Sequence, residues 1–262
     1  MSYGKEELGK QFLPEARKHT GTIVYAPKHS QGPTSYGCAS CVYIEYRSRR
    51  FAITCEHVTR DASSVYVLAI APSNEPTPLG PVTQLIPATV LKEDAEHDLA
   101  VLDAQTVDFS VAEKQPFASG TSDFITQGCL EDQPGLLSFT YGTLGSKTEL
   151  VPTGKNRYVE VPIYSAGGQI KTVTPTAITA EFKEQELLFH NVEVFPQLQD
   201  MKVSGGSRDL RGMSGSGLWI RDNYGVLLAG ILKGPASGEI ADPEIRFTPI
   251  WVLRTILGKM DK

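Results

Sequence analysis

The residues best suited to nucleophilic chemistry lie in a glycine-rich segment late in the chain, Gly212-Met-Ser214-Gly-Ser-Gly217. Glycines permit the strained dihedral angles of a tight turn and leave the approach to a serine hydroxyl open. Backbone N–H groups in such a turn can converge on one point, as stabilisation of an oxyanion requires. Glycine–serine turns are also common in inactive loops, so the interpretation depends on the residues upstream.

A serine hydroxyl needs a base to take its proton, and the base needs a third group to fix its tautomer. Of five histidines, His57 is the best candidate, because the apolar segment Phe51-Ala-Ile53 fixes it at a strand end. The rival His97 adjoins Asp98, and adjacent side chains on an extended segment point in opposite directions. The remaining histidines, which we expect in surface or packing roles, are His19, His29 and His190.

Asp98 is the best candidate for the third group. It precedes the apolar run Leu99-Ala-Val-Leu102, which would bury its carboxylate at the start of a strand. A buried carboxylate needs a partner, and an imidazole N–H is a suitable one. The nearby acids that we interpret as solvated charges are Asp94, Glu96 and Asp103. Together, His57, Asp98 and Ser214 predict an activated serine.

Three segments carry a family resemblance: Phe51-Ala-Ile-Thr-Cys-Glu-His57-Val58, His97-Asp98-Leu-Ala-Val-Leu102 and Gly212-Met-Ser214-Gly-Ser-Gly217. They resemble the chymotrypsin-like (trypsin-like) serine peptidases in the order His, Asp, Ser and in the separations of 41 and 116 residues.

The resemblance implies a peptidase site between two barrels. Ser214 would be the nucleophile, His57 the general base and then acid, and Asp98 the group that orients His57. The N–H groups of Gly212 and Ser214 would form the oxyanion hole. The substrate would be a peptide bond in a protein, and the resemblance implies no cofactor and no metal.

Substrate contacts follow from the same resemblance. The segment Ala229–Gly234 resembles the strand that pairs with substrate backbone; its predicted contacts are Leu232, Lys233 and Gly234. The residue six before the nucleophile often lines the floor of the primary pocket in this family. Here it is Arg208, which would favour an acidic residue, but the next residue, Asp209, would favour a basic one. The alternative is a surface ion pair between them, so specificity stays open.

Two departures from the family concern activation. Val58 stands where secreted members often carry a disulfide cysteine, and Met213 stands where an aspartate pairs with a freshly cut N-terminus. Methionine cannot make that ion pair. We therefore expect control by ordering of the pocket or by a regulatory protein partner, as would suit intracellular bacterial or viral branches.

The rest of the chain predicts an all-β fold of two packed antiparallel β-barrels, chymotrypsin-like, because short strand-like segments follow one another with little helix between them. We expect an N-terminal extension with a short helix (1–20), a barrel carrying His57 and Asp98 (21–115), a barrel carrying Ser214 (116–248) and a C-terminal helix (249–262). The predicted strands include Thr22–Tyr25, Cys41–Tyr46, Phe51–Thr54, Ser64–Ile70, Gln84–Leu91, Leu136–Gly142, Arg157–Tyr164, Lys171–Phe182, Leu187–Phe195, Leu218–Ile220 and Val226–Leu232. The last helix would have Thr248 as N-cap, Pro249 at its first position and Gly258 as its stop.

The composition of the chain indicates which partners are not expected to bind it and in which cellular compartment it is expected. The 262 residues are 40% hydrophobic and 21% charged with a net charge of −5, so we expect no attraction to nucleic acid or anionic membrane. The polar N-terminus, Met1–Leu8, is unlike a signal peptide and predicts a cytoplasmic protein. Four cysteines suit a reducing compartment. Cys38-x-x-Cys41 is a weak metal signal without a second pair, and buried free thiols are the expected state.

Two alternative functions stay open at this point. An esterase or other acyl hydrolase would need Gly-x-Ser-x-Gly followed by a helix. Here Ser216 replaces the second glycine, and a strand-like segment follows. The other alternative is a protease-like binding module without activity.

Overall fold

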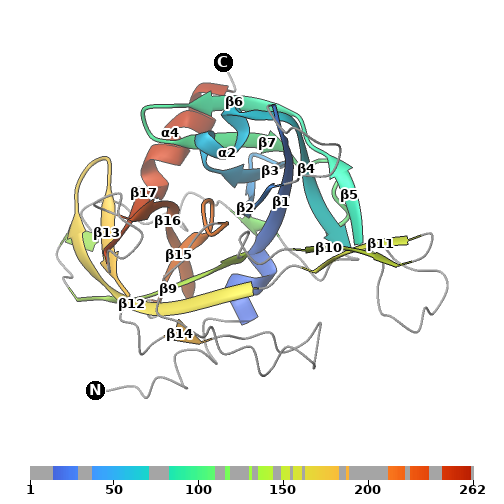
Figure 1. The fold of residues 1–262 in the computed structure, drawn as a ribbon. Coiled ribbons are helices and arrows are strands. Elements are labelled where there is room, and N and C mark those ends of the chain that lie inside the picture. Colours follow the sequence, from blue (N-terminus) through green and yellow to red (C-terminus); the bar gives the residue numbers. More distant parts are fainter. Residues whose placement is uncertain are drawn as a thin grey trace.

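The computed structural model describes the chain in segments, whose residues are 14–28, 37–70, 83–109, 116–118, 130–131, 135–143, 149–153, 156–160, 163–182, 187–188, 212–221, 225–235 and 244–260. Two large antiparallel sheets contain most of the described residues, and Figure 1 shows them packed against each other. Residues 1–13, 208 and 209 lie outside the described residues.

The first sheet is an open half-barrel with the strand order β5-β4-β1-β2-β3-β7-β6, and β8 pairs with β2 in parallel. Its strands are β1 (Thr20–Pro27), β2 (Gly37–Tyr46), β3 (Arg49–Thr54), β4 (Ala62–Ile70), β5 (Thr83–Pro87), β6 (Val90–Asp94), β7 (Leu99–Asp103) and β8 (Phe117–Ala118). The short helix α2 (Glu56–Arg60) follows β3 directly. The central strands β2, β3 and β7 are buried on both faces, because successive side chains along each strand enter two different apolar clusters.

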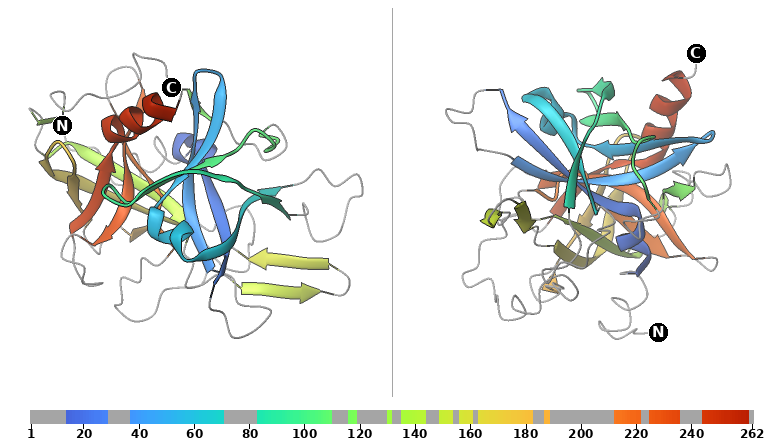
Figure 2. Two further views of the ribbon diagram at one scale, coloured as in Figure 1. Left: turned by 90° about the horizontal axis from the view of Figure 1, so that it is seen from above. Right: turned by 90° about the vertical axis from the view of Figure 1, so that its right-hand side faces the viewer.

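The second sheet has the order β13-β17-β16-β15-β9-β12-β14, and it closes into a six-stranded barrel because β12 pairs with both β9 and β13. Its strands are β9 (Leu137–Thr143), β12 (Ile163–Val173), β13 (Ile178–Glu181), β14 (Leu187–Leu188), β15 (Gly217–Arg221), β16 (Val226–Pro235) and β17 (Glu244–Pro249). A separate hairpin of β10 (Glu149–Thr153) and β11 (Asn156–Glu160) extends away from both sheets in Figure 2.

A shared apolar core fixes the two halves relative to each other. One cluster of buried side chains combines Ile53 of the first sheet with Trp219 of the second and with Leu253 of the helix α4 (Ile250–Met260). Each half also has its own cluster. Burying a large apolar side chain contributes about 1.5–3 kcal/mol, so a core common to both halves holds the surface between them in one arrangement.

The predicted all-β fold with two packed antiparallel barrels, chymotrypsin-like, is confirmed. Three predicted strands are wrong as single elements. Gln84–Leu91 is divided between β5 and β6, Arg157–Tyr164 between β11 and β12, and Lys171–Phe182 between β12 and β13. Local strand propensity cannot show these breaks, because the strands on either side of each break pair with different neighbours.

Both predicted helices exist with other limits. Residues 14–19 are helical, and the earlier part of the N-terminal extension lies outside the described residues. The C-terminal helix begins at Ile250 and runs past Gly258 to Met260. Thr248 does not act as the predicted N-cap, because it lies in β17 and its hydroxyl donates to the carbonyl of His97 at 2.6 Å. The pairing of β17 in the sheet and the bond to His97 therefore engage Thr248 in place of the predicted cap.

Candidate active site

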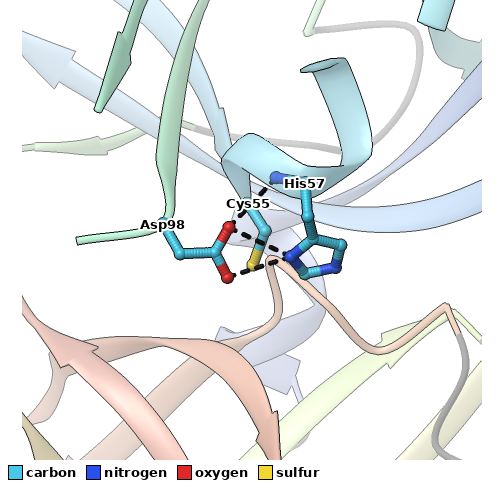
Figure 3. A group of neighbouring side chains, drawn as sticks. All are labelled: Cys55, His57 and Asp98. Atoms are coloured by element: carbon cyan, nitrogen blue, oxygen red, sulfur yellow. Dashed lines mark hydrogen bonds and ion pairs between the residues drawn. The ribbon is translucent and has the colours of Figure 1, made fainter. Parts of the chain in front are cut away.

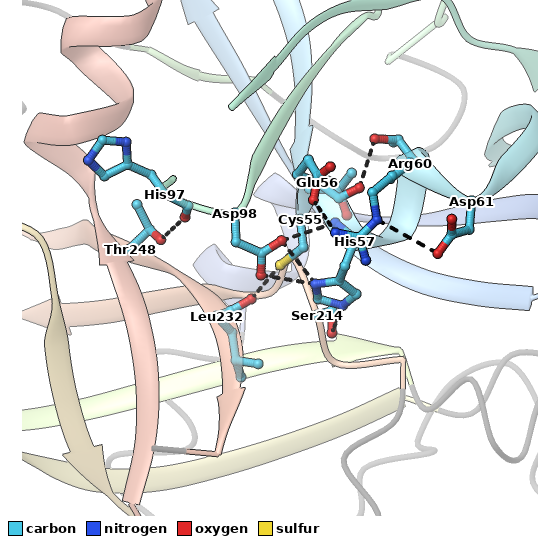
Figure 4. Close-up of polar contacts among 12 residues, drawn as sticks. Cys55, Glu56, His57, Arg60, Asp61, His97, Asp98, Ser214, Leu232 and Thr248 are labelled. Carbon is cyan, nitrogen blue, oxygen red and sulfur yellow. Dashed lines mark hydrogen bonds and ion pairs between the residues drawn. The ribbon is translucent and has the colours of Figure 1, made fainter. Parts of the chain in front are cut away.

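The three residues predicted to act together come from three separate segments. His57 lies in α2, Asp98 in the turn before β7, and Ser214 in the turn before β15. His57 Nε2 is 3.0 Å from Ser214 Oγ, and His57 Nδ1 is 2.9 Å from Asp98 Oδ2. Figure 4 shows the imidazole ring between the hydroxyl and the carboxylate. The structure therefore brings these three side chains into one hydrogen-bonded line.

The carboxylate determines which ring nitrogen carries the proton. An ionised carboxylate only accepts hydrogen bonds, so it favours the tautomer with N–H at Nδ1 of His57. Nε2 is then an acceptor for the Ser214 hydroxyl. Asp98 Oδ1 also accepts the backbone N–H of His57 at 3.0 Å, which ties the start of α2 to the same carboxylate. This arrangement can take a proton from a serine hydroxyl.

Asp98 lies in a strained turn that other residues hold. Its φ of 53° is in the left-handed region, which is uncommon for a residue other than glycine. The turn is tied at His97, whose backbone N–H donates to Asp94 Oδ1 at 3.0 Å and whose carbonyl accepts from Thr248. The side chain of His97 contacts Asp94 and not Asp98, as predicted, but the segment is a turn and not the extended segment from which the prediction was argued.

Burial and hydrogen bonding act in opposite directions on Asp98. Burial raises the pKa of its carboxyl, but the side-chain and backbone N–H groups of His57, with the charges of His57 and Lys233, outweigh burial and leave the pKa below its ordinary value. The carboxylate therefore stays ionised at neutral pH. The side chain of His57 is 40% exposed and that of Asp98 only 18%, so the ring can meet a substrate while the carboxylate stays behind it.

The Asp94–His97 contact should make stability depend on pH. Burial raises the pKa of Asp94, but the hydrogen bonds from His97 outweigh it and lower that pKa. The ionised group therefore adds stability above its unfolded-state pKa of about 3.9, and this stability is lost as the pH falls through the lower folded-state value. We expect Asp94→Asn to reduce the free energy of unfolding by about 1 kcal/mol at pH 7 and by less at about pH 3. Urea titrations at both pH values measure this, and an equal loss at both would contradict it.

The nucleophile turn is shaped by two glycines with positive φ, Gly212 at 94° and Gly215 at 90°. The carbonyl of Met213 accepts from Ser216 N at 2.8 Å. Because a trans peptide is planar, the N–H of Ser214 points away from that bond. Within the described part of the chain, neither Gly212 N nor Ser214 N donates a hydrogen bond. The two predicted oxyanion-hole donors are thus not engaged by those residues.

Gly215 has no room for a side chain. A Cβ there would lie 2.1 Å from Ser40 O and 2.5 Å from Thr54 Oγ1, whereas one at Gly135, with φ of 82°, would meet nothing within 4 Å. We expect Gly135→Ala to cost about 1 kcal/mol for the backbone alone and Gly215→Ala about 2–5 kcal/mol for backbone and overlap together. Urea unfolding of both variants measures the difference, and equal losses would contradict the steric account.

Cys55 is a site residue that the sequence reasoning missed. It is fully buried within 4.8 Å of ligand atoms of His57 and Asp98, and its Sγ donates to the carbonyl of Leu232 at 3.0 Å. Burial raises the pKa of this thiol well above its ordinary value, and the charge of Asp98 raises it further. A cysteine in an apolar segment gives no signal of such a contact, since the partner lies 177 residues away.

Cys55, His57 and Asp98 also form a set of zinc-type ligands, whose ligand atoms lie within 4.8 Å of one another (Figure 3). Zinc takes thiolate, imidazole and carboxylate ligands. Here each of these groups already has a hydrogen-bond partner, and the raised pKa of Cys55 keeps its proton in place. We interpret the group as a hydrogen-bond network. The other described cysteines, Cys38 and Cys41, are buried and form no disulfide with a described cysteine, and Cys129 lies outside the described residues.

The predicted substrate strand lies beside this network. In β16, Leu232 is buried and its carbonyl also accepts from Gly215 N at 2.9 Å. Lys233 is half-buried, and its charge acts on both Asp98 and Cys55. Gly234 follows with half-buried, extended backbone. Contact with a substrate stays a prediction for these three residues, and Arg208 and Asp209 lie outside the described residues.

The architecture around these side chains is the chymotrypsin fold. Among solved structures, this chain is similar to the HtrA-type protease AlgW with a tripeptide, at a TM-score of 0.52 and 15% identity over 98% of this chain and 64% of that chain. It is also similar to the serine endoprotease from Yersinia pestis, at a TM-score of 0.52 and 14% identity over 99% of this chain and 67% of that one. These identities show a shared fold, and the chain spans about two thirds of the length of those structures.

Comparison of the sequence with known families and proteins finds no match. No family model and no curated protein matches the sequence. In the segments that the structure describes, no helix combines the length and the apolar character that a membrane span requires.

Proposed function

We propose that this protein is a serine endopeptidase that cleaves peptide bonds in proteins through an acyl-enzyme intermediate. The observation that carries the proposal is the line of contacts from Ser214 Oγ to His57 Nε2 at 3.0 Å and from His57 Nδ1 to Asp98 at 2.9 Å. A hydroxyl is a poor nucleophile without such a base. The chymotrypsin fold around the contacts supports the same chemistry.

In the proposed first step, Ser214 Oγ adds to the scissile carbonyl carbon while its proton passes to His57 Nε2. The carbonyl oxygen becomes an oxyanion between the N–H groups of Gly212 and Ser214. Asp98 stabilises the imidazolium that forms. His57 then donates its proton to the leaving amine as the C–N bond breaks, which leaves an ester on Ser214. A water deprotonated by His57 hydrolyses that ester and restores the hydroxyl.

The pairing of β16 supports a peptide substrate. Opposite β15, the described pairing of β16 ends at Ile231, which faces Gly217, whereas opposite β17 it continues to Pro235. Within the described chain, Gly234 and Pro235 of β16 therefore have a strand partner on one side only, and Lys233 lies at a bulge in the β16–β17 pair. An extended peptide can add to such an edge through main-chain hydrogen bonds, and it would then pass the hydroxyl of Ser214.

Met213 supports a form of control without cleavage of the N-terminus. Its side chain is fully buried in the core of the second barrel, with Ser216 Oγ 3.9 Å from its sulfur. An apolar anchor of this kind replaces the ion pair of secreted zymogens. We therefore propose that activity depends on ordering of the substrate pocket or on a regulatory protein partner.

Cleavage of a peptide library, compared with hydrolysis of a matched ester, tests the function. We expect the wild-type protein to cut peptide bonds and Ser214→Ala to cut none above background. Turnover of the ester without any peptide cleavage would instead show an acyl hydrolase. Binding of peptides without turnover of either substrate would show a binding module.

A further inference from the structure

Ser40 of β2 connects the first sheet to the nucleophile turn of the second. It is fully buried, its N–H donates to Ser214 O at 2.9 Å, and its Oγ donates to Gly212 O at 2.9 Å. The same Oγ accepts from Thr143 N at 2.7 Å, and the Ser40 carbonyl accepts from Thr54 Oγ1 at 2.8 Å. One residue thus holds the carbonyls of both Gly212 and Ser214.

These two carbonyls belong to the residues whose N–H groups are the proposed oxyanion hole. Gly212 has a φ of 94°, and a glycine rotates about φ and ψ more freely than any other residue. Among the described residues, only the hydroxyl of Ser40 donates to its carbonyl. This bond restrains rotation about ψ of Gly212, so the Gly212 N–H keeps its direction relative to the held carbonyl as long as φ is unchanged.

Gly142 leaves room for this hydroxyl. A Cβ on Gly142 would lie 2.5 Å from Ser40 Oγ and 1.8 Å from Ser216 Oγ, so the absence of a side chain there makes room for both hydroxyls. Because Ser40 Oγ donates to the half-buried carbonyl of Gly212 and accepts from the buried N–H of Thr143, removing it leaves two backbone groups without these bonds. Such groups are costly to bury unpaired.

We propose that Ser40 is a positioning residue for acyl transfer: its hydroxyl holds Gly212 so that the N–H groups of Gly212 and Ser214 stay aimed at the developing oxyanion. This inference rests on the proposed peptidase function. It differs from a purely structural role for Ser40, because preorganised donors act on the transition state and contribute little to binding of the ground state.

Ser40→Ala tests the inference, because it removes the hydroxyl and keeps the backbone bond from Ser40 N to Ser214 O. We expect kcat for a cleaved peptide to fall about 10- to 100-fold, less than the loss of an oxyanion-hole donor itself, while KM changes by no more than about twofold. Inhibition by a peptidyl trifluoromethyl ketone, which forms an oxyanion adduct with the serine, should weaken by the same factor. Binding of the uncleaved peptide to the Ser40→Ala, Ser214→Ala double variant should match that to Ser214→Ala.

Thr22→Val is the matched control. Thr22 faces Ser40 across the β1–β2 pair, and its Oγ1 is 2.7 Å from Thr143 Oγ1. This variant also removes a hydroxyl contact between the halves, but it leaves the contacts of Gly212 intact. We expect a comparable loss of stability with kcat unchanged. If Ser40→Ala does not fold, Ser40→Cys fills the same space with a much weaker hydrogen-bonding group and should also lower kcat.

Each outcome decides between the two ideas. An active wild-type protein with undiminished kcat in the folded Ser40 variant overturns the positioning role and leaves the peptidase function standing. Equal falls of kcat in Ser40→Ala and Thr22→Val also overturn it, because they indicate general loosening between the halves. A wild-type protein that neither cleaves peptide nor reacts with the ketone overturns the peptidase function, and the inference fails with it.

Discussion

Replacing Ser214 with alanine is expected to lower kcat for peptide hydrolysis by about 10⁴- to 10⁶-fold. Alanine has no hydroxyl to add to the scissile carbonyl, so the acyl-enzyme cannot form. Since His57 Nε2 lies 3.0 Å from this hydroxyl, His57→Ala should cause a loss of the same order. The double variant should lose no more, because the two residues act as one unit. Single-turnover cleavage of a peptide chosen from the library measures all three rates.

The control for this prediction is Ser63→Ala. Ser63 is exposed in β4, and its hydroxyl contacts the carbonyl of Ala26, far along the chain from the nucleophile turn. We expect wild-type kcat in this variant. Additive losses in the His57 and Ser214 variants, or peptide cleavage that survives Ser214→Ala, would show that another group is the nucleophile.

Replacing Asp98 with asparagine should lower kcat by about 10⁴-fold with little change in KM. The amide can donate to Nδ1 of His57, which favours the tautomer with N–H at Nε2. That tautomer cannot accept the proton of Ser214. Because Nδ1 lies 2.9 Å from the carboxylate in the wild-type protein, the amide at position 98 would act directly on the choice of tautomer. Steady-state kinetics at pH 7 and near-ultraviolet circular dichroism together separate loss of activity from loss of fold.

The control for this variant is Asp103→Asn. Asp103 ends β7, the strand that Asp98 precedes, and its carboxylate accepts from the backbone of Gln105 at 3.0 Å. We expect its kcat within about twofold of wild type, as for a surface substitution. A loss of less than tenfold in Asp98→Asn would contradict a tautomer-fixing role.

The residues of the candidate site could be predicted from sequence because each stands where an element ends. His57 follows an apolar strand, Asp98 precedes one, and Ser214 lies in a turn that contains two glycines with positive φ, Gly212 and Gly215. These are local features, so residue types and spacing reveal them. The resemblance to the chymotrypsin-like peptidases supplied the pairing between them, which no local pattern contains.

The contacts behind the site could not be predicted in the same way. Ser40 and Cys55 bond to residues 172 and 177 positions further along the chain, and each lies in a segment that indicates only a buried strand. Thr248 has the local signature of a helix cap, but its hydroxyl bonds to His97. In each case the packing of one half on the other selects the partner. Sequence patterns describe the faces of single elements and do not contain this choice.

The most direct test of the account is the site of covalent labelling by a fluorophosphonate, determined by mass spectrometry of the intact chain and of its peptides. A serine activated by an adjacent base attacks phosphorus, displaces fluoride and gains one phosphonyl group per chain. The account predicts one adduct, on Ser214, and none in either Ser214→Ala or His57→Ala. Absence of an adduct on the wild-type protein, or an adduct on any other residue, would contradict it.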